Sequence, residues 1–235
     1  MPVFPLEGVV MFPNTYLPLN IFELRYLKMI DYSMSQKNRL IGMIQPKKTR
    51  DKDEDIDLYN VGCAGRIIKF EETEDSRYLV TLKGVSRFNL LSNITNKDNF
   101  KEAKVSWNEF TEDLNQEGSK ESFVSLKKAL KDFFKLKKMK VNMEIIDACN
   151  DYNFVDQITM ICPLALEEKQ LLLETKPITK RNNLLRSIIE SYSSEQNITN
   201  TVKHKLLFIK KKNKNEYLAD KHKKNRQWQK FINKI

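Results

Sequence analysis

The spacing of the hydrophobic residues changes near residue 118, and this change limits the fold more than any other feature of the sequence. Before it, short apolar runs are interrupted by proline and glycine, which is typical of short β-strands. After it, apolar residues recur every three or four positions, which is typical of amphipathic helices. The sequence therefore predicts an α+β fold, with a β domain over residues 1–115, a helical subdomain over 119–193 and a basic tail over 197–235.

The clearest element of the first part is a β-hairpin. Residues 61–70 and 78–82 are rich in β-branched and aromatic side chains, and a turn over 74–76 separates them. Residues 85–90 alternate apolar and polar side chains, which is the period of a half-buried strand. Many short strands with a single helix suggest a small closed or half-closed barrel. Further strands are expected at residues 3–4, 9–12, 40–44 and 102–107.

Apolar stripes predict one helix within the β domain and several after it. The early helix covers residues 22–30, and we expect its Phe22 and Tyr26 to plug the barrel. Thr179 is the expected N-cap of the last helix, which carries an apolar face from Leu184 to Tyr192. The other helices are expected at residues 123–134, 141–148, 154–161 and 166–174.

The net charge of +10 comes from the C-terminal segment. Residues 197–235 hold 12 Lys/Arg and 2 Asp/Glu, which leaves 29 of each for residues 1–196. Basic residues interleaved with aromatic ones suit binding to RNA or the ribosome. A basic amphipathic helix would instead suit an anionic membrane surface, and a solvated extension needs no partner. The tail residues that would contact nucleic acid or a membrane are Lys210, Lys211, Lys212, Lys223, Lys224, Arg226 and Trp228.

The residues that most enzymes need are missing from the body of the chain. Its 6 glycines form no phosphate-binding loop, and its 3 scattered cysteines form no zinc site. Both histidines, His204 and His222, lie in the tail, so histidine cannot act as an acid or base in the body. Ser125 and Lys128 match an S-x-x-K pattern that has no companion motif. We therefore expect no enzymatic activity, no metal and no cofactor.

No segment resembles an export signal or a membrane span. The first residues carry neither a basic region nor a long apolar stretch, and no run approaches roughly 18 uncharged apolar residues. The cysteines are too few for a disulfide framework. The sequence therefore predicts a cytoplasmic protein without a transmembrane segment.

Ordered blocks of residues over the first ninety positions carry a family pattern. The blocks are residues 2–6, 12–13, 17–26, 39–43, 59–67, 75–79 and 82–88. They resemble the LON substrate-binding domain, which is the N-terminal domain of ATP-dependent Lon proteases. Residues 160–164 and 167–170 resemble the helical half of stand-alone bacterial LON-domain proteins.

This resemblance implies a PUA-like β pseudo-barrel with one inserted helix, followed by a helical extension. In Lon proteases the domain delivers unfolded substrates to an ATPase ring and a serine–lysine protease, and it also serves as an adaptor module in a eukaryotic ubiquitin-ligase receptor. We expect this chain to stop before any ATPase or peptidase domain. The resemblance then implies a binding module for unfolded or specific protein clients, an adaptor in protein quality control, with an ATP-dependent protease or chaperone as a candidate partner.

The motif residues divide into two groups. We expect the extended segment before the first helix to contact a peptide, with strand addition at an open barrel edge contributing to affinity. The candidate peptide contacts are Pro18, Leu19, Asn20 and Ile21. The other motif residues are expected to form the scaffold, and they are Phe22, Glu23, Arg25, Tyr26, Gly62, Gly65, Arg66, Gly84, Arg87 and Phe88.

Overall fold

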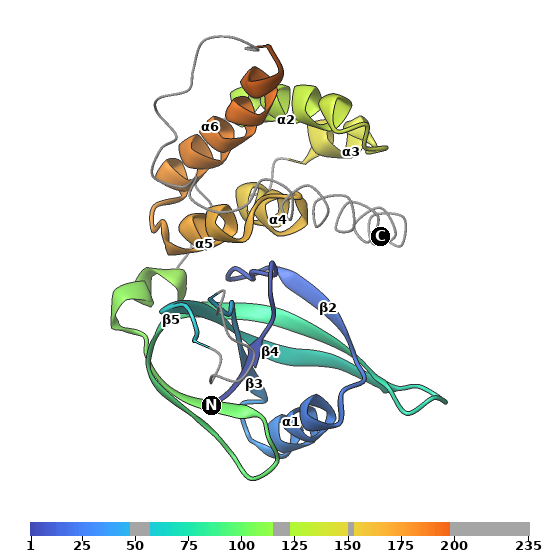
Figure 1. The fold of residues 1–235 in the computed structure, drawn as a ribbon, viewed down its shortest axis with the longest axis vertical. Coiled ribbons are helices and arrows are strands. Elements are labelled where there is room, and N and C mark those ends of the chain that lie inside the picture. Colours follow the sequence, from blue (N-terminus) through green and yellow to red (C-terminus); the bar gives the residue numbers. More distant parts are fainter. Residues whose placement is uncertain (48–56, 115–122, 150–152, 198–235) are drawn as a thin grey trace.

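The structure is a computed structural model that describes residues 1–47, 57–114, 123–149 and 153–197. A curved β-sheet forms its lower part, and the helices α2 to α6 stack above one end of that sheet (Figure 1). This arrangement confirms the α+β fold. The predicted boundary between the β and helical parts falls on residues 115–122, and both this segment and residues 198–235 of the tail lie outside the described residues.

The sheet closes on itself through its longest strand. The strand order is β2-β5-β4-β3-β1-β6, and β5 also pairs with β6, so the sheet curls into a barrel with β2 added outside the ring. β1 and β3 are parallel, whereas the other pairs are antiparallel. The strands are β1 (Pro2–Pro5), β2 (Tyr16–Ile21), β3 (Leu40–Ile44), β4 (Val61–Glu72), β5 (Tyr78–Thr95) and β6 (Lys101–Ser106).

The predicted hairpin is β4 and β5, and its second strand is longer than expected. The runs 78–82 and 85–90 are one continuous strand that passes through Gly84. The backbone N–H of Gly84 donates to the carbonyl of Thr15 at 2.9 Å, and its carbonyl accepts from Asn14 at 2.9 Å. A side chain at Gly84 would overlap the carbonyl oxygen of Phe12, so glycine allows the loop before β2 to lie directly against β5.

The expected strand at residues 9–12 is wrong. The segment is irregular and pairs with no strand of the described part of the chain. The backbone of Phe12 forms hydrogen bonds within a local turn instead. The Thr15 hydroxyl donates to the carbonyl of Phe12 at 2.6 Å and accepts from the Phe12 N–H at 3.2 Å. Val10, Met11 and Phe12 are nevertheless buried, because the segment carries its side chains into the core.

The helices confirm the expected stripes but shift several ends. α1 begins after Glu23 rather than at Phe22, and α6 begins at Ile178, so Thr179 lies inside its first turn and is not the N-cap. A short 3₁₀ helix, η1, was not expected. The helices are α1 (Leu24–Ser35), η1 (Asn108–Leu114), α2 (Val124–Leu136), α3 (Met143–Ala148), α4 (Phe154–Ile161), α5 (Leu166–Glu174) and α6 (Ile178–Asn197).

One hydrophobic core runs from the barrel into the helices. It joins Met29 of α1 and Leu82 of β5 to residues of the later helices such as Phe133, Leu173 and Leu185, all of which are buried. A smaller cluster around Phe88 lies on the other side of the sheet. Because the large cluster is continuous, the helices and the barrel share a packed interface.

Two of the three cysteines are fully buried, and this gives a simple test of the packing. Burial raises the pKa of the Cys63 thiol, and it raises the pKa of Cys162 to about 12. Since the thiolate is the reactive form, we expect only Cys149, which is partly exposed, to react with Ellman's reagent in the native protein. All three should react in denaturant. Rapid native reaction of three thiols would contradict this packing.

Candidate peptide-binding surface

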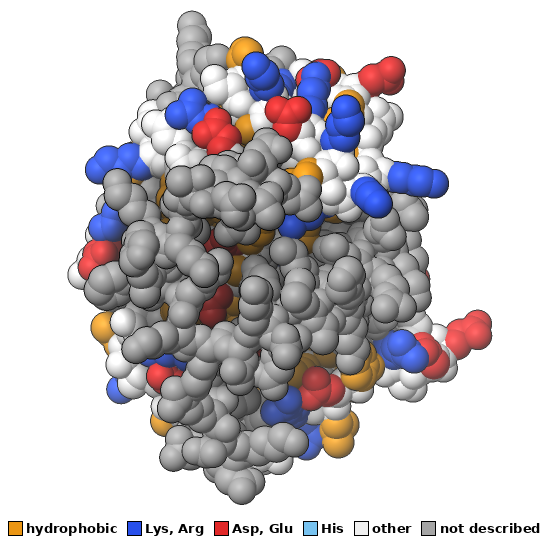
Figure 2. Space-filling model, turned by 45° about the horizontal axis from the view of Figure 1, so that its top comes forward, with side chains coloured by type: hydrophobic (Ala, Val, Ile, Leu, Met, Phe, Trp, Pro, Cys, Tyr) orange, Lys and Arg blue, Asp and Glu red, His pale blue; other side chains and the backbone are white. Residues whose placement is uncertain are grey.

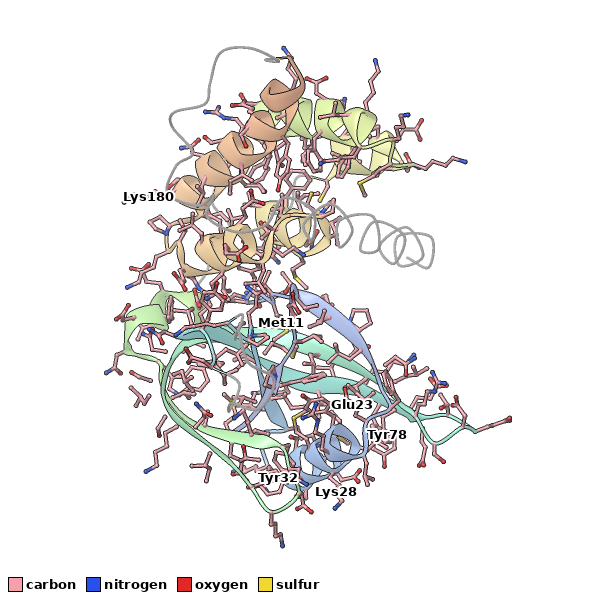
Figure 3. The ribbon with its side chains drawn as sticks, in the orientation of Figure 1. Met11, Glu23, Lys28, Tyr32, Tyr78 and Lys180 are labelled. Carbon is pink, nitrogen blue, oxygen red and sulfur yellow. The ribbon has the colours of Figure 1, made fainter. Side chains whose placement is uncertain are left out.

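The outer ends of three strands form an arm that projects from the barrel (Figure 1, right). Ile21 of β2 pairs with Tyr78 of β5, and Tyr78 pairs with Glu72 of β4. In the hairpin turn at the tip of the arm, Ser76 adopts a left-handed backbone conformation, with a φ of 59°. Figure 2 shows charged side chains of both signs on this projecting arm, and Figure 3 shows Tyr78 beside α1.

The predicted peptide contacts lie on β2 at one edge of this arm. Pro18 and Asn20 are exposed, Leu19 is half-buried against the core, and Ile21 is buried. The expectation for Ile21 is therefore wrong, because its side chain faces the core and offers no surface to a peptide. The alternation follows from the strand, in which successive side chains point to opposite faces.

Two apolar side chains that were not among these contacts complete the surface. Phe22 is 65% exposed, so the expectation that it plugs the barrel is wrong, whereas Tyr26 does pack in the core. The guanidinium of Arg77 lies 6.0 Å from the Phe22 ring. Leu24, at the start of α1, is 69% exposed. We call Pro18, Asn20, Phe22 and Leu24 the β2–α1 corner.

The charged residues of the motif brace the start of α1. Arg25 donates from Nε and Nη2 to one carboxylate oxygen of Glu23, at 3.0 and 2.8 Å. Its guanidinium also lies 4.5 Å from the ring centroid of Tyr26. Burial raises the pKa of Tyr26. These contacts join Glu23, Arg25 and Tyr26 at the start of α1, and the scaffold role expected for them stays a prediction.

A buried ion pair joins the barrel to the helices. Arg87 on β5 donates from Nε to Oδ2 of Asp113 at 2.9 Å and from Nη2 to Oδ1 at 2.8 Å. Its Nη1 donates to the carbonyls of Leu173 and Thr175, each at 3.0 Å. Arg87 thus connects β5, η1 and the end of α5.

A second buried pair lies nearby on the helical side. Arg181 donates from Nε to Oδ1 of Asp156 at 2.6 Å, from Nη2 to Oδ2 at 3.0 Å, and from Nη1 to the carbonyl of Thr175 at 2.8 Å. Its guanidinium lies 5.0 Å from the ring centroid of Phe12. Burial raises the pKa of Asp156, and the charge of Arg181 opposes that rise.

Further buried polar side chains continue this interface. The Nζ of Lys169 donates to the carbonyl of Gly8 at 3.0 Å. Gln45 donates to the amide oxygen of Gln170 at 3.0 Å, and Gln170 donates to the carbonyl of Val61 at 3.1 Å. Lys169 and Gln170 belong to the block 167–170 that carries the family resemblance, whereas Gln45 was not singled out from the sequence. Their partners are carbonyl and amide oxygens of neighbouring elements, so their role is to fix the helices on the barrel.

The family model of the ATP-dependent protease La (LON) substrate-binding domain matches residues 1–191. The chain belongs to this family. It is 26% identical to the Lon protease of Buchnera aphidicola subsp. Acyrthosiphon pisum over 92% of this chain, and 28% identical to Lon protease 1 of Syntrophobacter fumaroxidans over 88%. Those matches cover only 28% and 26% of the two relatives, so this chain spans little more than a quarter of their length.

Solved LON domains have the same fold. The N-terminal domain of Mycobacterium avium complex Lon protease superposes with a TM-score of 0.56 at 14% identity, covering 81% of this chain and 98% of that one. The Lon N-terminal domain protein from Xanthomonas campestris gives a TM-score of 0.54 at 19% identity, covering 80% and 96%. These similarities confirm the fold expected from the resemblance.

The glycines of the LON motif allow close packing on β4. A side chain at Gly62 would lie 2.5 Å from the ring of the buried Phe88 and 2.6 Å from the carbonyl of Met43. One at Gly65 would lie 2.6 Å from the methyl carbon of Met11, at the barrel end that faces the helices (Figure 3). The register also shifts between Ala64 and Gly65, so β4 carries a bulge beside this close packing.

The S-x-x-K pattern and one of the scaffold candidates lie at the surface. Ser125 and Lys128 are exposed on α2, and Arg66, expected in the scaffold, is exposed on β4. No group of three His, Cys, Asp or Glu side chains in the described part of the chain could hold a metal ion. No helix among these residues is long and apolar enough to cross a membrane. The basic tail lies outside the described residues, so its nucleic-acid contacts stay a prediction.

Proposed function

We propose that this LON domain binds unfolded or specific protein clients at the β2–α1 corner and catalyses no reaction itself. It would act as an adaptor in protein quality control, handing clients to an ATP-dependent protease or chaperone in the cytoplasm. The match to a substrate-binding domain over residues 1–191 is the observation that carries this proposal.

The corner suits this role because it presents apolar side chains on a rigid base. Phe22 and Leu24 point outward from the junction of β2 and α1, and the ion pair of Glu23 with Arg25 lies between them. Burying one such side chain in a complex contributes about 1.5–3 kcal/mol. An unfolded client exposes apolar side chains that could be buried here, whereas a folded protein hides them.

The corner is tested by replacing both apolar residues. We expect a Phe22→Ser/Leu24→Ser variant to bind reduced, carboxymethylated α-lactalbumin at least about tenfold more weakly than the wild type, because burial of two side chains is lost. Fluorescence anisotropy of the labelled client measures the affinity. The client is permanently unfolded, so its own folding does not affect the result.

The matched control removes two equally exposed apolar residues elsewhere. Leu91 and Ile94 on β5 are 66% and 67% exposed, close to the values for Phe22 and Leu24. A Leu91→Ser/Ile94→Ser variant should bind the client within twofold of the wild type. Equal losses in both double variants would mean that binding is non-specific, and no binding by the wild type to any of several unfolded proteins would refute the proposed function.

A further inference from the structure

The two long edges of the arm differ in their backbone chemistry. On β2, the Thr15 carbonyl accepts from Gly84 of β5, so Thr15 faces β5. The backbone groups of an antiparallel strand alternate in direction, and Tyr16, Pro18 and Asn20 therefore point away from β5. Pro18 has no N–H, so the middle of this edge lacks a donor. Proline at this position blocks the addition of another strand.

The β4 edge has no such block. The N–H of Thr73 donates to the carbonyl of Arg77 at 2.9 Å, which fixes Thr73 as a residue that faces β5. By alternation, Glu71 also faces β5, whereas the N–H and C=O groups of Phe70 and Glu72 point away from it.

The neighbouring strand on that side ends before this segment. β3 pairs with β4 only as far as Leu40 and Arg66, and the Ile67 N–H donates to the carbonyl of Arg39 at 3.0 Å. Among the described residues, no strand pairs with residues 68–72 of β4 on the side away from β5. We call this segment the β4 edge, and its side chains are all exposed.

Apolar side chains and acidic ones lie together at the β4 edge. Ile68 and Phe70 are exposed large hydrophobic residues, and the Phe70 ring packs edge-on against Tyr78 with a centroid distance of 4.8 Å. Desolvation raises the pKa of Tyr78, and a hydrogen bond from its hydroxyl to Asp31 of α1 and the charges of Asp31 and Glu72 raise it further.

Negative charge predominates along this part of the arm. The two basic residues are already paired, Lys69 with Glu71 and Arg77 with Asp75. The acidic residues of this stretch, 68–78, are Glu71, Glu72, Glu74 and Asp75. A strand that pairs with the β4 edge would place its side chains opposite these carboxylates, and opposite charges across a strand pair are stabilising.

We propose that the β4 edge adds an extended segment of a client as a further β-strand, and that it selects segments in which an apolar residue adjoins two consecutive Lys or Arg residues. The apolar residue lies opposite Phe70, and the basic residues lie opposite Glu71 and Glu72. Backbone hydrogen bonds to Phe70 and Glu72 supply affinity that does not depend on the client's sequence, and the charges supply selectivity. This inference rests on the proposed function and defines the class of client.

The test compares proline substitutions on the two edges. Phe70→Pro removes an N–H that points away from β5, so the pairing of β4 with β5 is retained. The probe is a short fluorescent peptide that repeats Val-Lys-Lys, called the Lys–Val peptide, and we expect its affinity for Phe70→Pro to fall roughly tenfold. Tyr16→Pro makes the same change on the β2 edge, outside the β2–α1 corner, and should leave the affinity within twofold. Urea unfolding of both variants shows that they are folded.

A charge reversal tests the selectivity. Glu72→Lys should weaken binding of the Lys–Val peptide and strengthen binding of a matched Glu–Val peptide, with both effects shrinking at high salt. Equal binding of the two peptides to the wild type, or normal binding of the Lys–Val peptide to Phe70→Pro, would overturn the inference. If unfolded α-lactalbumin still binds in that case, the proposed function stands without the β4 edge; if neither probe binds, the proposed function itself fails.

Discussion

An Asp113→Ala variant is expected to have a free energy of unfolding about 3–5 kcal/mol below that of the wild type. The substitution leaves the buried guanidinium of Arg87 without its carboxylate, and the carbonyls of Leu173 and Thr175 cannot neutralise its charge. The backbone N–H of Arg87 also loses its acceptor, because it donates to Oδ2 of Asp113 at 2.9 Å. Urea unfolding followed by circular dichroism measures the change.

The control for this prediction is an exposed ion pair. Lys28 and Asp98 lie 3.0 Å apart on the surface, where water screens the charges. Asp98→Ala should therefore cost less than about 1 kcal/mol. An Arg87→Met/Asp113→Leu variant, which removes both charges, should recover part of the stability lost in Asp113→Ala. Equal stability of Asp113→Ala and Asp98→Ala would show that the buried pair does not stabilise the fold.

A Gly84→Ala variant should be destabilised by about 3 kcal/mol or more. The added carbon meets the backbone of Phe12 and Pro13, which cannot rotate out of the way as a side chain can. The loop before β2 would have to move away from β5, and the hydrogen bonds of Gly84 with Thr15 and Asn14 would lengthen. The midpoint of urea unfolding should fall accordingly.

Gly42→Ala is the matched control, because its close neighbours are side-chain atoms. A carbon there would lie 2.9 Å from Cγ1 of Val3 and 3.0 Å from Cε of Met1, which can shift. We expect a loss of about 1 kcal/mol. Equal urea midpoints for the two alanine variants would contradict this explanation. They would show that the close approach of the loop before β2 does not require glycine at position 84.

The sequence predicted for most elements whether they are helices or strands, because the spacing of the apolar residues along a segment differs between the two. It did not predict where each element ends. Phe22 continues the apolar stripe of Tyr26, yet β2 extends to Ile21 and the helix starts only at Leu24, so Phe22 lies at a corner and faces solvent. Because both Phe22 and Leu24 were assigned to the predicted helix, neither was predicted to belong to the candidate surface.

The buried charges could not be predicted from the sequence. Asp113 follows a strand in a polar stretch, and Arg181 lies among Lys180 and Asn182, so both have the composition of a solvent-exposed surface. Their burial depends on partners that are distant in sequence, since Arg87 meets Asp113 and Arg181 meets Asp156. The blocked edge of β2 could not be predicted either. The sequence shows a proline at position 18, but only the strand register shows that its missing N–H would face away from β5.

The pairing of β1 has a consequence for how the chain folds during synthesis. β1 bonds to β3 on one side and to β6 on the other, with Val3 opposite both Gly42 and Lys101. The ribosome must therefore complete Lys101–Ser106 before the first strand has both neighbours, a delay of several seconds at roughly 5–20 residues per second. Throughout that interval the backbone N–H and C=O groups on at least one side of β1 are unpaired. Unpaired strand edges can pair with other chains, so this is the stage of synthesis at which we expect aggregation to threaten the chain most.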